Sequence, residues 1–295
     1  MNFLIYSLYK GVIMKITFLG TAAATAMPLP FCDCAVCKAS RKLKGKNIRK
    51  RSSIAINNDL IIDLGPDSVS ACTEYNIDLS KIKYILQTHA HSDHFDAGHL
   101  VTRHVDYVSK NIQDIILVSS PNTMKVLNRK MQSEDFRIDI FNSESQRDLA
   151  LQLNTISHKE QIILGDYKIS SFESLHDISE QSLIYLIQSK DKTVLYGTDL
   201  LEISEEVYTL LKNYYIDIVI LDQTYGEGYN AGGHLDASQV VKIINCMKEM
   251  RIINECSQIF ATHISHEGNN THEIMEEIAR QNFYNIAYDG CTVEV

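Results

Sequence analysis

The chain has 295 residues, 45% of them hydrophobic, and a formal net charge of −9. A chain of this length can bury a substantial core as one α/β domain, and its acidic balance disfavours loose, charge-driven binding to nucleic acid. The seven cysteines form no paired disulfide framework, so they indicate a reducing, cytoplasmic location.

The first thirteen residues are apolar, but they match neither a signal peptide nor a membrane span. They lack a basic N-terminal segment and a small-residue cleavage site, and they are too short to cross a bilayer. No other stretch could serve as a transmembrane helix, so we predict no membrane association. We interpret residues 1–13 as an N-terminal extension and expect residues 14–295 to form a single domain.

The apolar pattern predicts many short strands with helices between them. This arrangement favours a four-layer αββα sandwich, in which two mixed β-sheets pack between layers of helices. Residues 121–165 carry no ligand motif and are the hardest segment to interpret. The predicted strands are residues 16–19, 53–56, 60–63, 84–88, 115–118, 169–172, 182–188, 194–196, 218–221 and 259–262, and the predicted helices are residues 67–75, 97–108, 204–213, 237–250 and 272–281.

Three cysteines, Cys32, Cys34 and Cys37, lie within six residues near the N-terminus. Such a knuckle is typical of a structural zinc site that lacks only its fourth ligand, although three reduced cysteines without metal would give the same spacing. A closed site of four ligands leaves no open coordination position. Its role would therefore be to fix the loop in place and not to react.

A basic run follows the knuckle, with seven lysines and arginines among residues 41–51. Most such runs are solvated surface segments. The alternative is that its end, residues 49–51, helps to attract an anionic substrate, with Arg51 as the candidate contact.

The segment 88–94 reads Thr-His-Ala-His-Ser-Asp-His and directly follows an apolar run. Zinc and similar cations prefer neutral imidazole nitrogens together with carboxylate oxygens. In an extended loop His89 and His91 point the same way, and the following turn lets Asp93 and His94 face a second ion. The segment therefore predicts a site for two metal ions.

Further metal-ligating residues occur where other apolar runs end. His176, Asp199 and His263 each follow a predicted strand, and Asp63 ends an earlier one. Loops at strand ends are where a scaffold usually displays its chemistry.

In this order of residues the chain resembles the metallo-β-lactamase-fold hydrolases from Met14 onward. In that superfamily a strand-ending aspartate precedes His-x-His-x-Asp-His, which is followed by a histidine, an aspartate and a final histidine. The resemblance implies that Asp63 orients the histidine loop by hydrogen bonds without touching metal. The implied ligands are His89, His91 and His176 for the first ion, Asp93, His94 and His263 for the second, and Asp199 as the bridge.

The knuckle resembles one branch of this superfamily, that of the PhnP-type phosphoribosyl cyclic phosphodiesterases. There a histidine three residues after the last active-site histidine completes the zinc site, and here that residue is His266. The resemblance thus implies two Zn²⁺ or Mn²⁺ ions in the active site and one structural Zn²⁺. It also suggests a homodimer.

The function implied is hydrolysis of a small phosphodiester, cyclic nucleotides included. Two ions lower the pKa of a shared water, so that hydroxide is available near neutral pH, and the leaving alkoxide needs a proton. His234, on the glycine-rich segment Gly232-Gly233-His234, matches the branch's non-ligand histidine and is the candidate donor, with Asp93 as the second catalytic residue. A histidine near a helix N-terminus could also be structural.

Three alternative functions are compatible with parts of this set of metal-ligating residues. A tRNase Z-type RNA endonuclease also uses a loop histidine near this point, although the acidic balance and the lack of a tRNA-gripping arm count against nucleic acid. A lactone or thioester hydrolase would keep the fold but has no expected need for the knuckle or for His234. A metal-stabilised scaffold without activity would not explain why every ligand is retained.

Overall fold

The structure is a computed structural model that describes residues 14–108, 112–133, 137–229 and 231–295. The N-terminal extension expected at residues 1–13 lies outside the described residues. Among the residues described, no helix is both long and apolar enough to cross a bilayer.

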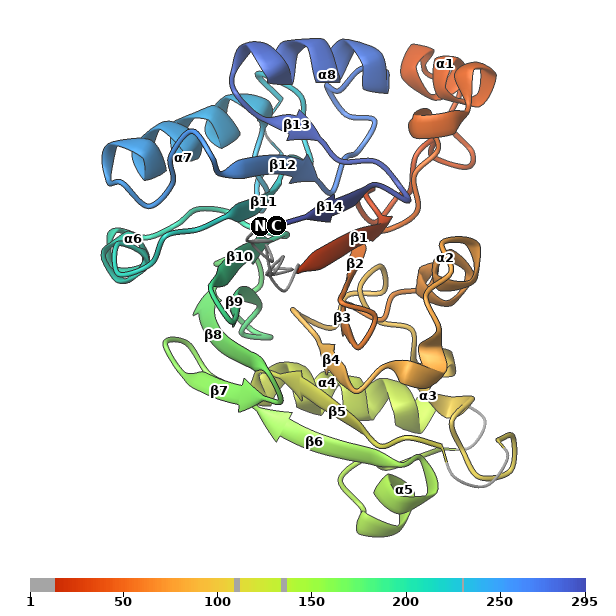
Figure 1. The fold of residues 1–295 in the computed structure, drawn as a ribbon. Coiled ribbons are helices and arrows are strands. Elements are labelled where there is room, and N and C mark those ends of the chain that lie inside the picture. Colours follow the sequence, from red (N-terminus) through yellow and green to blue (C-terminus); the bar gives the residue numbers. More distant parts are fainter. Residues whose placement is uncertain (1–13, 109–111, 134–136, 230) are drawn as a thin grey trace, which may run out of the picture.

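Two seven-stranded sheets form the middle of the fold (Figure 1). The first has the order β14 (Thr292–Glu294), β1 (Lys15–Gly20), β2 (Ser53–Ile56), β3 (Leu60–Ile62), β4 (Tyr84–Leu86), β5 (Ile115–Ser119) and β6 (Leu151–Thr155). The second has the order β13 (Asn285–Ile286), β12 (Gln258–Thr262), β11 (Ile218–Asp222), β10 (Lys192–Gly197), β9 (Leu183–Ser189), β8 (Tyr167–Glu173) and β7 (Gln161–Leu164). Both sheets are mixed: β3 to β6 are parallel in one, β10 to β13 are parallel in the other, and the remaining neighbours are antiparallel.

Helices cover the outer faces of both sheets. Those between residues 68 and 133 pack on the first sheet, those between residues 205 and 281 pack on the second, and the helix at residues 35–43 places Val36 against the core of the second. The helices are α1 (Ala35–Leu43), α2 (Ser68–Glu74), α3 (Ala97–Val101), α4 (Pro121–Ser133), α5 (Ser143–Asp148), α6 (Glu205–Leu211), α7 (Ala237–Glu249) and α8 (His272–Gln281), with short 3-10 turns at Gly45–Asn47 and Leu79–Lys81.

Strand alternation explains the layers. Val194 and Tyr196 of β10 belong to the apolar core that also contains residues of the first sheet, whereas Leu195 between them belongs to the core beneath α6 and α7. Because successive side chains point to opposite faces of a sheet, an unbroken apolar strand can fill both cores at once. Phe18 of β1 meets Phe260 of β12 across the inner core, with ring centroids 5.6 Å apart. The predicted αββα sandwich is confirmed.

The element prediction was wrong in several places. It missed β6, β7, β13 and β14 and the helices α1, α4 and α5, and it extended α3 to residue 108 whereas α3 ends at Val101. β6 lacks an apolar run because three of its five residues are polar and exposed, namely Gln152, Asn154 and Thr155. After α3 the chain turns, and Arg103 donates hydrogen bonds to the carbonyl oxygens of Leu149 and Ala150 instead of continuing the helix.

The topology brings several strand ends to one edge. Strands β10, β11 and β12 are parallel, and β8 runs in the same direction because β9 is antiparallel to both β8 and β10. The carboxyl ends of these four strands therefore meet at one edge, where open α/β sheets bind ligands. The residues that follow them include His176, Asp199, Asp222 and His263.

Candidate metal centre

All seven side chains predicted as active-site ligands lie together at this edge. The potential ligand atoms within each group lie no more than 4.8 Å apart. The groups are His89, His91 and His176; Asp93, His94 and His263; and His89, His94 and Asp199. The first two groups have the composition expected for the two ions, while the binding of metal itself stays a prediction.

Asp199 lies between the two groups. Its Oδ1 is 3.4 Å from His176 Nε2 and 3.9 Å from His89 Nε2. Its Oδ2 is 2.9 Å from His94 Nε2 and 3.2 Å from His263 Nε2. Each oxygen thus faces one group, which is the geometry a bridging carboxylate needs.

The polar atoms in the centre fit cations. His89 Nε2 and Asp199 Oδ2 are buried and make no hydrogen bond within the described part of the chain. Imidazole nitrogens also face each other, with His94 Nε2 and His263 Nε2 3.4 Å apart. Buried polar atoms are rarely left without partners. These two atoms, surrounded by other imidazole nitrogens and carboxylate oxygens, therefore match the donor set of zinc or manganese.

The pKa values of His89 and Asp199 agree with this interpretation, whereas Asp199, Asp93 and Asp63 raise the pKa of His94 well above its usual value against the effect of burial. Burial holds the pKa of His89 well below its usual value, so its ring is neutral as a metal ligand must be. Burial raises the pKa of Asp199, but His263, His94 and His89 together lower it well below the usual range, and the carboxylate is ionised. A buried carboxylate needs positive charge beside it, which divalent ions would supply.

Hydrogen bonds on the far side of the imidazoles aim their Nε2 atoms at the centre. Nδ1 of His94 lies 2.8 Å from Asp63 Oδ2, that of His176 lies 2.7 Å from the Gly233 carbonyl oxygen, and that of His263 lies 2.7 Å from Thr224 Oγ1. Such partners fix the tautomer and orientation of metal-binding histidines.

Asp63 is fully buried and lies where the sequence places an orienting carboxylate. Besides facing His94, its Oδ1 accepts hydrogen bonds from the Thr88 backbone N–H at 2.8 Å and from Gln87 Nε2 at 2.9 Å. Its backbone has φ +65°, and Asp199 and His263 also have positive φ values of +50° and +60°. Left-handed backbone at residues other than glycine is costly and clusters at functional sites.

His234 lies beside the centre and is held by a carboxylate. Its Nδ1 is 3.1 Å from Asp222 Oδ2 and 3.8 Å from Asp199 Oδ1, and its ring stacks on His263 at 5.2 Å. Burial lowers the pKa of His234, but Asp222 and Asp199 raise it to about 9.

Asp222 was missed by the sequence analysis. It accepts hydrogen bonds from the backbone N–H groups of Asp199 at 3.0 Å and Thr224 at 2.8 Å, in addition to its contact with His234. The sequence does contain a signal for Asp222. It ends the apolar run Ile-Val-Ile-Leu-Asp of β11, and an aspartate or histidine at the end of an apolar run was the signal for the other ligands.

The basic run is placed differently from the expectation. Arg49 is only 2% exposed and donates hydrogen bonds to Thr21 Oγ1 and, with its other terminal nitrogen, contacts His272 Nδ1 at 3.0 Å, so it cannot attract substrate from solvent. The guanidinium of Arg51 pairs with Asp67 at 3.0 Å. The substrate-binding role of Arg51 stays a prediction, and this pairing already neutralises its charge.

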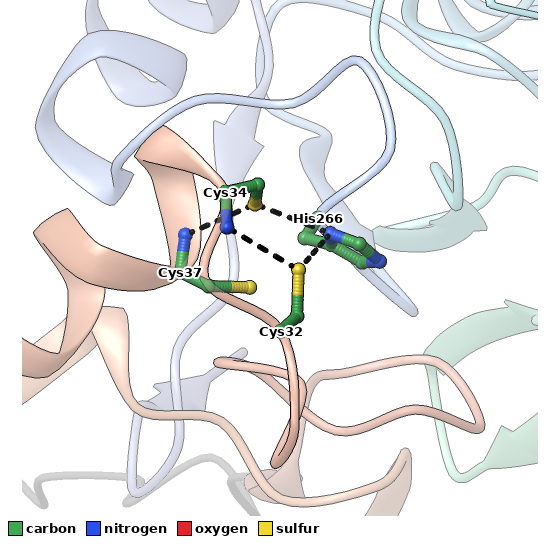
Figure 2. A group of neighbouring side chains, drawn as sticks. All are labelled: Cys32, Cys34, Cys37 and His266. Atoms are coloured by element: carbon green, nitrogen blue, oxygen red, sulfur yellow. Dashed lines mark hydrogen bonds between the residues drawn. The ribbon is translucent and has the colours of Figure 1, made fainter.

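The cysteine knuckle brings its three thiols to His266 (Figure 2). Sγ of Cys34 lies 3.5 Å and Sγ of Cys32 lies 3.7 Å from His266 Nδ1, and the four potential ligand atoms lie within 4.8 Å of one another. The Cys37 backbone N–H and His266 lower the pKa of Cys34 to about 6, which favours the thiolate that zinc binds. This donor set fits a tetrahedral structural zinc.

Comparison with known proteins agrees with this geometry. A family model described as "Beta-lactamase superfamily domain" matches residues 59–264. A search of curated protein sequences found no match.

Several solved structures share the fold. A diphosphatase of the PhnP family is similar with a TM-score of 0.70 and 22% identity, over 96% of this chain and 97% of that one. Zinc-bound PqqB from Methylobacterium extorquens has a TM-score of 0.71 and 18% identity, over 95% of this chain and 100% of that one. The short form of human tRNase Z has a TM-score of 0.62 and 18% identity, over 95% and 98%.

Proposed function

This chain belongs to the β-lactamase superfamily, and from that premise we propose that it is a metal-dependent hydrolase of a small phosphodiester. The predicted superfamily is confirmed by the family match, and the chain shares its fold with a diphosphatase of the PhnP family. The choice of a metal-dependent hydrolase is supported by the same match and by the candidate ligand groups.

The observation that supports a phosphodiester as the substrate is the position of His234. This histidine belongs to neither of the two ligand groups expected for the ions, although its potential ligand atom lies within 4.8 Å of those of Asp199, Asp222 and His263, and Asp222 holds it 3.8 Å from Asp199. Against the effect of burial, Asp222 and Asp199 raise the pKa of His234 to about 9, which favours the protonated ring. A proton donor at this place suits a phosphodiester, whose leaving alkoxide must be protonated.

The residues of the centre have different roles in the proposed hydrolysis. Divalent ions held by the two ligand groups would activate a water molecule and neutralise charge on the phosphoryl oxygens. Asp93 is ionised, since His94 and His263 hold its pKa far below the usual range against the effect of burial, and it can accept a hydrogen bond from the attacking water. His234 donates its proton to the leaving oxygen of the phosphodiester.

The proposal is tested by a hydrolysis screen of the full chain loaded with Zn²⁺ or Mn²⁺. The substrates are bis(p-nitrophenyl) phosphate, 2′,3′-cyclic nucleotides, a lactone, a thioester and a precursor tRNA. We expect turnover of the first two only. Turnover of the lactone or thioester alone, or cleavage of the precursor tRNA alone, would assign a different reaction to the same centre and overturn the proposal.

A further inference from the structure

A row of aromatic rings leads from His234 to the surface. The ring of Tyr225 meets that of His234 edge-on, with centroids 5.9 Å apart and an interplanar angle of 85°. The ring of Tyr229 follows at 5.2 Å from Tyr225. Tyr225 is only 8% exposed, whereas Tyr229 is 41% exposed, so the row ends in a ring that is partly open to solvent.

The backbone around Tyr229 is closely packed. The Gly226 N–H donates to the Glu267 carbonyl oxygen at 3.0 Å, and a Cβ at Gly226 would lie 1.8 Å from the carbonyl oxygen of Gly268. A Cβ at Gly268, where φ is +71°, would lie 2.9 Å from the Cβ of Tyr229. Two glycines therefore permit the approach of the two loops that positions the Tyr229 ring.

The same contacts tie this ring to the site. Glu267 directly follows His266 of the knuckle, and the Tyr225 N–H donates to the carbonyl oxygen of Leu235, the residue after His234. Tyr229 is thus held between the loop of the proposed proton donor and the loop that links the centre to the knuckle.

We propose that Tyr229 is a stacking platform for a nucleobase, so that the substrate is a nucleoside phosphodiester. This inference rests on the proposed function. With the leaving oxygen beside His234, the part of the substrate that carries this oxygen extends along the row of rings toward Tyr229. A planar base gains from stacking on a tyrosine face, whereas a sugar phosphate without a base would leave that face unused. Stacking accepts any base, so the platform selects for the presence of a base and not for its identity.

The test compares kcat/KM of the metal-loaded protein on adenosine 2′,3′-cyclic phosphate and on glycerol 1,2-cyclic phosphate. We expect the wild type to prefer the nucleotide and Tyr229→Ala to lower the ratio of the two values about tenfold, mainly through KM on the nucleotide. Tyr229→Phe, which keeps the ring, restores the ratio. Tyr215, also 41% exposed, precedes the amino end of β11, whereas Asp222 of the centre lies at its carboxyl end, so Tyr215→Ala serves as the matched control and keeps the wild-type ratio.

Calorimetric titration with adenosine 5′-monophosphate separates this inference from the proposed function. We expect binding by the wild type and weaker binding by Tyr229→Ala, whether or not the cyclic phosphates are turned over. Equal binding by both proteins, or an unchanged substrate ratio in Tyr229→Ala, overturns the platform. If both cyclic phosphates are hydrolysed without preference, the platform fails while the phosphodiesterase stands; if the monophosphate binds through Tyr229 but no phosphodiester is cleaved, the proposed function fails and the platform stands.

Discussion

The centre and the knuckle are both candidate metal sites, but they are built in opposite ways. The centre takes its ligands from loops after strands of both sheets, and its rings are oriented by buried partners such as Asp63 and Thr224. The knuckle takes three of its four ligands from residues 32–37 at the start of α1 and only His266 from afar, and two of its thiols are partly exposed.

The geometry of the two sites therefore depends on different parts of the molecule. The centre is formed by the packing of the whole fold, so its geometry is held even by residues that do not ligate. The knuckle is formed by one short segment that a single distant histidine closes, so we expect its order to depend on metal. Four changes would break or sharpen this contrast.

The largest effect is expected from Asp199→Ala, because Asp199 faces both ligand groups. We expect kcat/KM on bis(p-nitrophenyl) phosphate to fall roughly a thousandfold or more, and the metal content to fall from about three ions per chain to about one. Metal analysis and steady-state kinetics check this. Asp191→Asn, which changes an exposed carboxylate, is the control, and a variant that kept three ions and full turnover would contradict the bridging role.

The next largest effect is expected from Cys34→Ser in the knuckle. We expect the loss of about one metal ion per chain and a decrease of about 3 kcal/mol in the free energy of unfolding, because bound metal stabilises the folded state. The two ions of the centre should remain. Cys256→Ser removes an exposed thiol outside the knuckle and should change neither quantity. If Cys34→Ser keeps the wild-type metal content and melting temperature, the knuckle holds no structural zinc.

His234→Ala separates chemistry from metal binding in the centre. We expect kcat on adenosine 2′,3′-cyclic phosphate, whose leaving group is an alkoxide, to fall about a hundredfold with the metal content unchanged, since general acid catalysis contributes about this much. The loss should shrink on bis(p-nitrophenyl) phosphate, because its nitrophenolate leaving group needs little protonation. Full turnover in this variant would show that His234 does not donate the proton.

The smallest effect concerns the buried contact that attaches the segment after the knuckle to α8. Burial and the charge of Arg49 lower the pKa of His272 to about 4. An unfolded histidine has a pKa near about 6.5, so between these values the unfolded chain binds more protons, and His272 makes the fold less stable as pH falls from about 6.5 to about 4. Between pH 7 and pH 5 we expect this contribution to be about 2 kcal/mol.

Denaturant unfolding of wild type and His272→Gln at pH 7 and pH 5 measures the contribution of His272 to the free energy of unfolding. The stability difference between the two pH values should be smaller in the variant. Equal pH dependence in both proteins would show that His272 titrates normally in the folded state.

Much of the fold could be predicted because buried parallel strands are unbroken apolar runs. The strands that lead to the ligands, such as those before His176 and Asp199, were found within one or two residues. Edge strands and the helices α1, α4 and α5 were missed. The sequences of β6 and α5 are largely polar, whereas α4 does carry a buried apolar stripe of Met124, Leu127 and Met131 that the prediction overlooked.

The sequence by itself determined the donor types and their grouping: three imidazoles and a carboxylate in residues 89–94, three thiols in residues 32–37, and an aspartate or histidine after several apolar strands. These follow from the chemistry of the side chains and from local spacing. Only the tertiary structure decided that each oxygen of Asp199 faces a different ligand group, that Asp222 holds His234, that Arg49 is buried, and that Tyr229 lies on the row of rings. The physical reason is that distances between residues far apart in the chain are set by how the two sheets and their loops pack, and no local pattern encodes them.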